Sequence, residues 1–316
     1  MEKLLTVILP AYNEEDNIHP AAETISRLLA AEGIPFELLF VNDGSRDGTW
    51  AAIRRESAGN PAVRGLRFSR NFGKESAIFA GLANAAGACA VVIDCDLQHP
   101  PEKIVEMYRL WEQGYEIVEG VKLDRGEESV FHTLAARCFY GLISKAVGID
   151  MSHASDFKLL DRKAISALLT MREKNVFFRA LSFWVGFRTA SVEFDVRERT
   201  AGTSKWSTRA LVRYAVNNIT SFSAAPMQIV TVLGLLMLAI SLILGVTALA
   251  QKLRGTALGG FTTVIIIQLF TGSIVMISLG IIGYYIAKMY EEVKGRPKFI
   301  VSETCGESKH EQTLIG

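Results

Sequence analysis

The chain has 316 residues, of which 34 are Lys or Arg, 33 are Asp or Glu and 49% are apolar. A net charge of +1 provides no basic field, so no nucleic-acid partner is expected, and the composition excludes disordered and collagen-like chains. The four cysteines are scattered and form neither a disulfide framework nor a zinc motif, which predicts a reducing compartment for the polar part.

Short apolar runs alternate with amphipathic stretches through the first half of the chain. The runs are continuous, which is typical of strands that are buried on both faces of a sheet. We expect strands at residues 4–9, 36–41, 63–68, 90–93 and 117–121, and helices near 18–31, 49–57, 74–86, 101–113 and 130–147. This order predicts an α/β fold with a mostly parallel, doubly wound sheet that binds ligands at the carboxyl ends of its strands.

Residues 161–224 have a different pattern. Aromatic-rich helices are expected at 161–171 and 177–187, followed by a strand at 189–196. Basic and aromatic side chains then mark residues 205–222 as an amphipathic helix directly before a long apolar run. This pattern favours a helix in the membrane interface, with an ordinary core-packing helix as the alternative.

Two long stretches without charged residues follow, at 226–250 and 261–287. A helix of the first stretch would be about 37 Å long, enough to cross a hydrocarbon core of about 30 Å. The sequence thus predicts a C-terminal transmembrane hairpin, and a buried helical hairpin is the alternative. Positive side chains are denser outside the pair than between its members, which predicts a multi-pass inner (cytoplasmic) membrane protein with a cytosolic catalytic domain. The residues from Cys305 are polar and are expected to fray.

Polar clusters follow three of the predicted strands, at residues 10–15, 42–49 and 94–100. Because the carboxyl ends of parallel strands meet at one edge, these clusters should converge on one crevice. The first strand lacks a Gly-x-Gly-x-x-Gly turn, and the sequence has no P-loop motif, which disfavours dinucleotide-binding and P-loop sites.

The pair Asp94 and Asp96 ends a buried strand, where two unpaired carboxylates would be costly. Oxygen ligands without a His or Cys partner favour Mg²⁺ or Mn²⁺ bridging a diphosphate, although Asp96 could instead cap the next helix. Asp43 is either a turn former or, with residues 10–14, part of a pocket for a base and ribose. Lys74 either approaches a phosphate or simply lies in a helix-start loop.

Several motifs in this order resemble family 2 glycosyltransferases of the GT-A fold. The subgroup is the one with dolichol-phosphate mannose synthase and the bactoprenol (undecaprenyl phosphate) glucosyltransferases. The resemblance covers nearly the whole chain and rests on PAYNEE (10–15), VNDGSRDGT (41–49), SRNFGKE (69–75), DCDLQHPPE (94–102), SDFKLLDR (155–162), RTAGTSKW (199–206) and YEEVKGRPKFIV (290–301).

The resemblance implies a role for each matching residue. The base and ribose would contact Pro10, Ala11, Tyr12, Glu14 and Asp43. The metal and the diphosphate would be held by Asp94, Asp96 and Gln98. The acceptor side would comprise the catalytic Asp156, the phosphate-binding Arg199 and Lys205 and, as a looser match, Arg125 and Arg137.

The implied reaction is inverting transfer of one sugar, glucose by expectation, from a UDP-sugar to undecaprenyl (polyprenyl) phosphate, giving a lipid-linked donor for cell-envelope glycans. The sequence lacks Gln-x-x-Arg-Trp, the signature of processive synthases, so one sugar per turnover is expected. A homo-oligomer and a membrane flippase partner are further expectations. The alternatives are a glycosyltransferase that acts on a lipid or glycan hydroxyl and an inactive membrane-anchored binding subunit.

We divide the chain by function into four parts. Residues 1–160 are the expected nucleotide-sugar-binding catalytic domain, and 161–224 are an acceptor-side and interfacial segment. Residues 225–288 are the two transmembrane helices, and 289–316 are a cytosolic tail.

Overall fold

A computed structural model describes residues 3–122, 155–171, 173, 177–195, 225–254 and 260–306. The chain forms two compact units, Met1–Ala210 with Pro297–Gly316, and Leu211–Arg296. The predicted helices at 130–147 and 205–222 lie outside the described residues.

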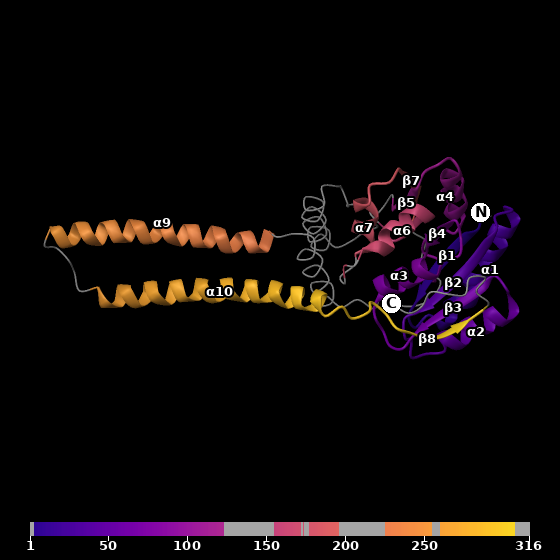
Figure 1. Ribbon diagram of the computed structural model, residues 1–316, viewed down its shortest axis with the longest axis horizontal. Helices are drawn as coiled ribbons and strands as arrows, with labels where there is room; N and C mark the ends of the chain where they lie inside the picture. The colour runs from indigo at the N-terminus through magenta and orange to yellow at the C-terminus, as the bar shows by residue number, and fades with distance from the viewer. Residues whose placement is uncertain are drawn as a thin grey trace. The chain divides into compact units, whose positions relative to one another are not determined.

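The first unit is built on an eight-stranded sheet with the order β7-β5-β6-β4-β1-β2-β3-β8 (Figure 1). Its strands are β1 (Leu5–Ala11), β2 (Phe36–Asn42), β3 (Val63–Phe68), β4 (Cys89–Val92), β5 (Ile117–Lys122), β6 (Lys158–Asp161), β7 (Thr189–Phe194) and β8 (Val301–Cys305). Only the pairings of β6 and β8 are antiparallel. The predicted α/β, mostly parallel sheet is confirmed.

Helices cover both faces of this sheet. The described helices of this unit are α1 (Glu15–Ala31), α2 (Thr49–Gly59), α3 (Lys74–Asn84), α4 (Glu102–Glu112), α6 (Arg162–Thr170) and α7 (Phe178–Trp184). Val7 of β1 belongs to the same hydrophobic core as Ile18 of α1. The next residue, Ile8, packs against α3 instead, so closely that a Cβ at Gly81 would lie 2.3 Å from Ile8 Cγ2. Because β1 is buried on both faces, its apolar run has no polar alternation.

Two strands, β6 and β8, were not predicted from the sequence. Four-residue β6 lies between β4 and β5, and β8 pairs with β3 at the far side of the sheet. Cys305, where fraying was expected, pairs with Gly65. The strand β8 covers the hydrogen-bonding edge that β3 would otherwise expose. The sheet also continues past residue 160 through β7, so the four-part division remains a prediction about function rather than a structural partition.

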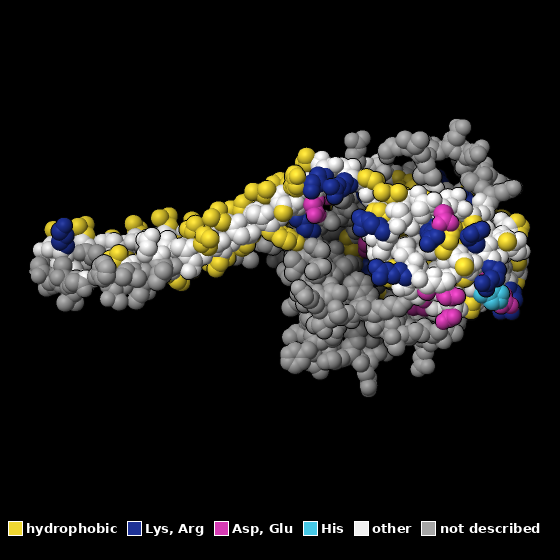
Figure 2. All heavy atoms as spheres, turned by 90° about the horizontal axis from the view of Figure 1, so that it is seen from below, with side chains coloured by type: hydrophobic (Ala, Val, Ile, Leu, Met, Phe, Trp, Pro, Cys, Tyr) yellow, Lys and Arg dark blue, Asp and Glu magenta, His cyan; other side chains and the backbone are white. Residues whose placement is uncertain are grey.

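The second unit contains two long helices, α9 (Ala225–Leu253) and α10 (Phe261–Val293), which contact each other. Both are long and apolar enough to cross a membrane. Figure 2 shows apolar side chains on the surface along these helices. Leu238 of α9 is 65% exposed and Met276 of α10 is 69% exposed. Such exposure around a helix is unfavourable in water and is expected for a helix in lipid.

Candidate functional site

The loops that follow β1 and β2 interlock at the carboxyl edge of the sheet. Pro10 and Ala11 end β1 beside Val41 and Asn42 of β2. The Asn13 amide donates to Ser45 Oγ at 2.9 Å, and Asn13 Oδ1 accepts from the Arg46 amide at 3.0 Å. These bonds fix the backbone at the positions that were predicted to contact a base and ribose.

Glu14 and Tyr12 complete that predicted donor pocket. The Glu14 amide donates to Thr49 Oγ1 at 2.9 Å, and Glu14 Oε2 accepts from Asn17 Nδ2 at 2.5 Å. Tyr12, the residue directly after β1, is 38% exposed. The first β-strand loop therefore offers one exposed aromatic face and one carboxylate, and binding of a base or ribose there remains a prediction.

Asp43 connects the loops after β2 and β3. Its amide donates to Ala11 O at 2.9 Å, and its carboxylate accepts from the Phe72 amide at 2.6 Å and the Gly73 amide at 2.9 Å. Burial raises the pKa of Asp43 in spite of these two amides. The neighbouring Gly44 has φ of +64°, and a Cβ there would lie 2.3 Å from a backbone carbon of the β3 loop. Only glycine allows the two loops to approach this closely.

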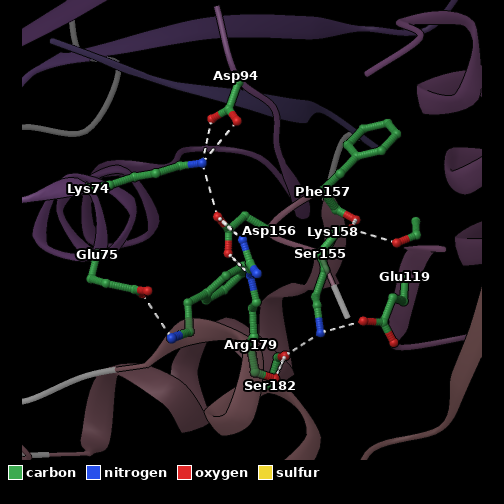
Figure 3. Close-up of polar contacts among 12 residues, drawn as sticks. Lys74, Glu75, Asp94, Glu119, Ser155, Asp156, Phe157, Lys158, Arg179 and Ser182 are labelled. Atoms are coloured by element: carbon green, nitrogen blue, oxygen red, sulfur yellow. Dashed lines mark hydrogen bonds and ion pairs between the residues drawn. The ribbon is translucent and has the colours of Figure 1, made fainter. Parts of the chain in front are cut away.

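Lys74, the first residue of α3, forms a bridge between two carboxylates (Figure 3). Its Nζ lies 2.7 Å from Asp94 Oδ1 and 3.0 Å from Asp156 Oδ2. Burial opposes the ammonium charge, but the carboxylates of Asp156 and Asp94 outweigh it and raise the pKa of Lys74. For Asp94, burial likewise acts against ionisation, but Lys74 outweighs it and lowers the pKa. Two acidic residues far apart in sequence thus share one cation.

Asp156 is held by a second cation as well. Arg179 of α7 donates from Nε to Asp156 Oδ1 at 2.7 Å and from Nη2 to Oδ2 at 3.0 Å. Burial raises the cost of the charge, but Arg179 and Lys74 hold the pKa of Asp156 well below its usual range. A two-point Arg–carboxylate contact also fixes the orientation of both groups. Asp156 is therefore an ionised and fixed carboxylate.

Glu75 is a third carboxylate beside this cluster. Its Oε2 accepts from the Phe178 amide at the start of α7, at 2.9 Å. Burial and the charge of Asp156 raise the pKa of Glu75 to about 7. Near neutral pH it is therefore partly protonated, and the two cations Lys74 and Arg179 mainly balance Asp94 and Asp156.

The predicted metal ligands lie in the turn after β4. The Gln98 amide donates to Asp96 Oδ1 at 3.2 Å, and the residue between them, Leu97, has φ of +54°. A non-glycine residue in this region marks a constrained turn. In the described part of the chain, no three His, Cys, Asp or Glu side chains are grouped to hold a metal.

The residues of this turn nevertheless fit a divalent cation that is shared with a substrate. Asp94 is ionised, 29% exposed, and already faces a cation in the form of the Lys74 ammonium. Mg²⁺ is usually bound by one or two carboxylates together with substrate phosphates, and it does not need a complete protein cage. Asp94, Asp96 and Gln98 supply oxygen donors of the required kind.

The predicted acceptor-side residues Arg125, Arg137, Arg199 and Lys205 lie outside the described residues. The structure therefore brings together Lys74, Asp94 and Asp156 on one side, and the β1 and β2 loops with Asp43 on the other.

Comparison with known proteins identifies the family. The family model described as glycosyl transferase family 2 matches residues 6–186, which is more than half of the chain. The chain belongs to glycosyl transferase family 2. It is a glycosyltransferase with a GT-A fold, as the sequence predicted.

Relatives of this glycosyltransferase match nearly its full length. It is 39% identical over 303 residues to the uncharacterized glycosyltransferase YkcC of Bacillus subtilis, covering 95% of this chain and 94% of the relative. It is 34% identical over 302 residues to a bactoprenol glucosyl transferase from an SfII prophage of Shigella flexneri, covering 95% and 98%. A crystal structure of glucosyl-3-phosphoglycerate synthase from Mycobacterium tuberculosis is similar with a TM-score of 0.49, 22% identity and coverage of 69% and 79%.

Three residues that lie in this candidate site were missed by the sequence analysis: Arg179, Glu75 and His99. His99 packs between Phe157 and Phe194, with ring centroids 5.2 Å away in each case, and its Nδ1 lies 4.0 Å from Asp94 Oδ2. Arg179 had one available signal, because it is the single charged residue in the mostly apolar α7.

A buried ion pair supports the segment that carries Asp156. Lys158 Nζ lies 2.9 Å from Glu119 Oε1 and donates to Ser182 Oγ at 2.8 Å, and Ser182 donates to the Arg179 carbonyl (Figure 3). The side chains of Lys158 and Glu119 are only 1% and 6% exposed. Burial lowers the pKa of Lys158, although Glu119 opposes this effect. The pair thus links β5, β6 and α7 beneath the site.

Substituting Lys158→Met should lower the free energy of unfolding by roughly 3–5 kcal/mol, because Glu119 would remain buried without its cation. Urea unfolding measures this change. The double variant Lys158→Met/Glu119→Leu should recover most of the lost stability, since no buried charge remains. A single variant as stable as the unaltered protein would contradict a structural role for the pair.

Proposed function

We propose that this glycosyltransferase transfers one glucosyl unit from UDP-glucose to undecaprenyl phosphate, a polyprenyl phosphate, with inversion and without processive elongation. The observation that carries the proposal is that a single chain combines a cation–carboxylate cluster at the sheet edge with two helices that are long and apolar enough to cross a membrane. The Shigella relative, named a bactoprenol glucosyl transferase, supports it because the match extends over both apolar helices and the catalytic unit.

The acceptor phosphate itself supplies the attacking oxygen in this proposal. A phosphate monoester has a second pKa of about 6 and is largely ionised at pH 7. A strong protein base is therefore unnecessary, which agrees with the low pKa of Asp156. We assign Asp156 to holding Lys74 and Arg179 in place and to stabilising positive charge that develops at the sugar. Direct attack on an α-linked donor gives a β-linked product.

On the donor side, Asp94, Asp96 and Gln98 would hold Mg²⁺ or Mn²⁺. When bound, the ion supplies charge that offsets the negative charge developing on the leaving UDP. Lys74 lies at the same carboxylate and adds a fixed positive charge near the diphosphate. The β1 and β2 loops, with Tyr12, Glu14 and Asp43, would hold the uracil and ribose.

We further propose that α9 and α10 form a transmembrane hairpin of a multi-pass inner-membrane protein with its catalytic domain in the cytosol. The strand β8 follows α10 and pairs with β3 in the catalytic sheet, so both ends of the hairpin connect to the same unit. A chain that crosses the membrane twice, once in α9 and once in α10, returns to the side from which it started, as this connection requires. A product made on the cytosolic face would need a flippase partner to reach the envelope, and a homo-oligomer remains a further prediction.

Arg199 and Lys205 are proposed to bind the acceptor phosphate, together with Arg125 and Arg137. Arg199→Ala and Lys205→Ala should each lower kcat/KM for the acceptor by an amount corresponding to roughly 1.5–3 kcal/mol of charged hydrogen bonding. Binding of UDP-glucose without acceptor, measured by calorimetry, should hardly change. Loss of membrane association with normal turnover of a short-chain soluble acceptor would contradict this role.

The proposed function is tested with purified full-length protein in lipid vesicles. Radiolabelled UDP-glucose with Mg²⁺ or Mn²⁺ and undecaprenyl phosphate should give a lipid-extractable β-linked product, and UDP-galactose and UDP-N-acetylglucosamine should react more slowly. Undecaprenol, which lacks the phosphate, is the matched acceptor control. Equal transfer to undecaprenol would indicate a hydroxyl acceptor, and no transfer with any donor would indicate a binding subunit.

A further inference from the structure

The segment that follows α10 packs against the loop that holds Asp43. The Phe299 ring stacks on Phe68 at the end of β3, with centroids 5.2 Å apart and an interplanar angle of 11°. Phe68 is 1% exposed and meets Phe72 edge-on, with centroids 5.7 Å apart. The Phe72 amide is one of the two donors to the Asp43 carboxylate. Three aromatic rings therefore connect the C-terminal segment to the predicted donor pocket.

Polar contacts fix this segment on both sides of Phe299. The Ser69 amide donates to the Ile300 carbonyl at 3.0 Å, and Lys298 Nζ donates to Met171 O at 3.1 Å. Farther along, Glu303 accepts from Trp50 Nε1 at 2.9 Å and from Arg67 at 2.6 Å. The register of β8 on β3 shifts between Arg67 and Phe68, next to the stacked rings. The segment is thus clamped at the place where β3 turns into the 69–73 loop.

We propose that Phe299 is a positioning residue for the sugar-nucleotide site. The inference rests on the proposed function. The Phe299 ring holds Phe68 and Phe72 in place, and the Phe72 and Gly73 amides then keep the Asp43 carboxylate oriented for the nucleotide. The two loops are in close contact at Gly44, where a Cβ would lie 2.3 Å from the backbone carbon of Arg70. A displaced 70–73 loop would therefore also displace the β2 loop. The chain after the second long helix thereby becomes part of the donor site.

If Phe299 positions the sugar-nucleotide site, its substitution should change donor binding in particular, which a role in stability alone would not do. Phe299→Ala should weaken UDP-glucose binding and raise KM for UDP-glucose about tenfold, the loss expected for an aromatic pair and the contacts that depend on it. The kcat and the KM for polyprenyl phosphate should stay within about twofold. Phe299→Tyr keeps the stacked ring and should restore binding. Ile300→Ala removes an apolar side chain from the adjacent, half-exposed position and should have no effect.

Hydrogen exchange gives a readout that does not depend on turnover. In Phe299→Ala, the Phe72 and Gly73 amides should exchange faster, while the β1 amides should keep their protection. If Phe299→Ala does not fold in the full-length protein, Phe299→Leu provides the same comparison with a smaller loss of packing. UDP affinity and amide protection equal to those of the unaltered protein would overturn the inference. Absence of UDP binding by the unaltered protein would instead overturn the proposed donor and, with it, this inference.

Discussion

Replacing Asp94 with Ala should reduce sugar transfer by roughly 10³-fold while leaving the protein folded, and Asp96→Ala should do the same. A charge placed to meet developing charge contributes about 10²–10³ in rate, and loss of the metal would remove more. Both residues lie in the turn after β4, and Asp94 is partly exposed, so their truncation leaves no cavity in the core. Transfer is measured as UDP release in vesicles.

The control for these variants is Asp16→Ala, which removes an exposed carboxylate from the first turn of α1 in the same unit. It should retain normal turnover. Circular dichroism and thermal unfolding check that each variant is folded. Normal activity of Asp94→Ala, or full activity of the unaltered protein in excess chelator, would refute the metal assignment.

Arg179→Ala should lose at least about 100-fold in kcat/KM and about 3 kcal/mol in unfolding free energy, because Asp156 would keep only one of its two cations in a buried position. Arg179→Lys retains the charge without the two-point contact and should recover part of both losses. Arg188→Ala, which removes an exposed arginine over Tyr115, is the matched control.

The stability loss in Arg179→Ala should depend on pH in a defined direction. The folded-state pKa of Asp156 is held low, so its ion pairs contribute stability above the unfolded value of about 4, and this contribution is lost as pH falls through the folded-state pKa. The difference in stability between the unaltered protein and the variant should therefore be full at pH 7 and shrink in acid. A difference that does not shrink at any acid pH at which both proteins stay folded would show that the effect arises from packing rather than charge.

Local sequence patterns predicted most of the elements. The continuous apolar runs of β1 to β5 and the long uncharged stretches of α9 and α10 are visible because burial or lipid exposure acts on each segment separately. The short polar clusters after β1, β2 and β4 likewise predicted the edge at which the site lies, since parallel strands place their carboxyl ends together. Asp94 and Lys74 were therefore predicted as candidate site residues without structural information.

Only the tertiary structure decided which charges meet and which segment closes the sheet. Glu303 pairs with Arg67 and Trp50 across more than 200 residues, and no local pattern marks a polar five-residue stretch such as β8 as a strand. Arg179 reaches Asp156 from helix α7, and this contact makes the carboxylate a fixed anion with a low pKa. A side chain's charge state depends on burial and on neighbours brought together by folding. The sequence therefore pointed to Lys74, Asp94 and Asp156 as candidate residues, whereas only the fold added Arg179 and set their charge states.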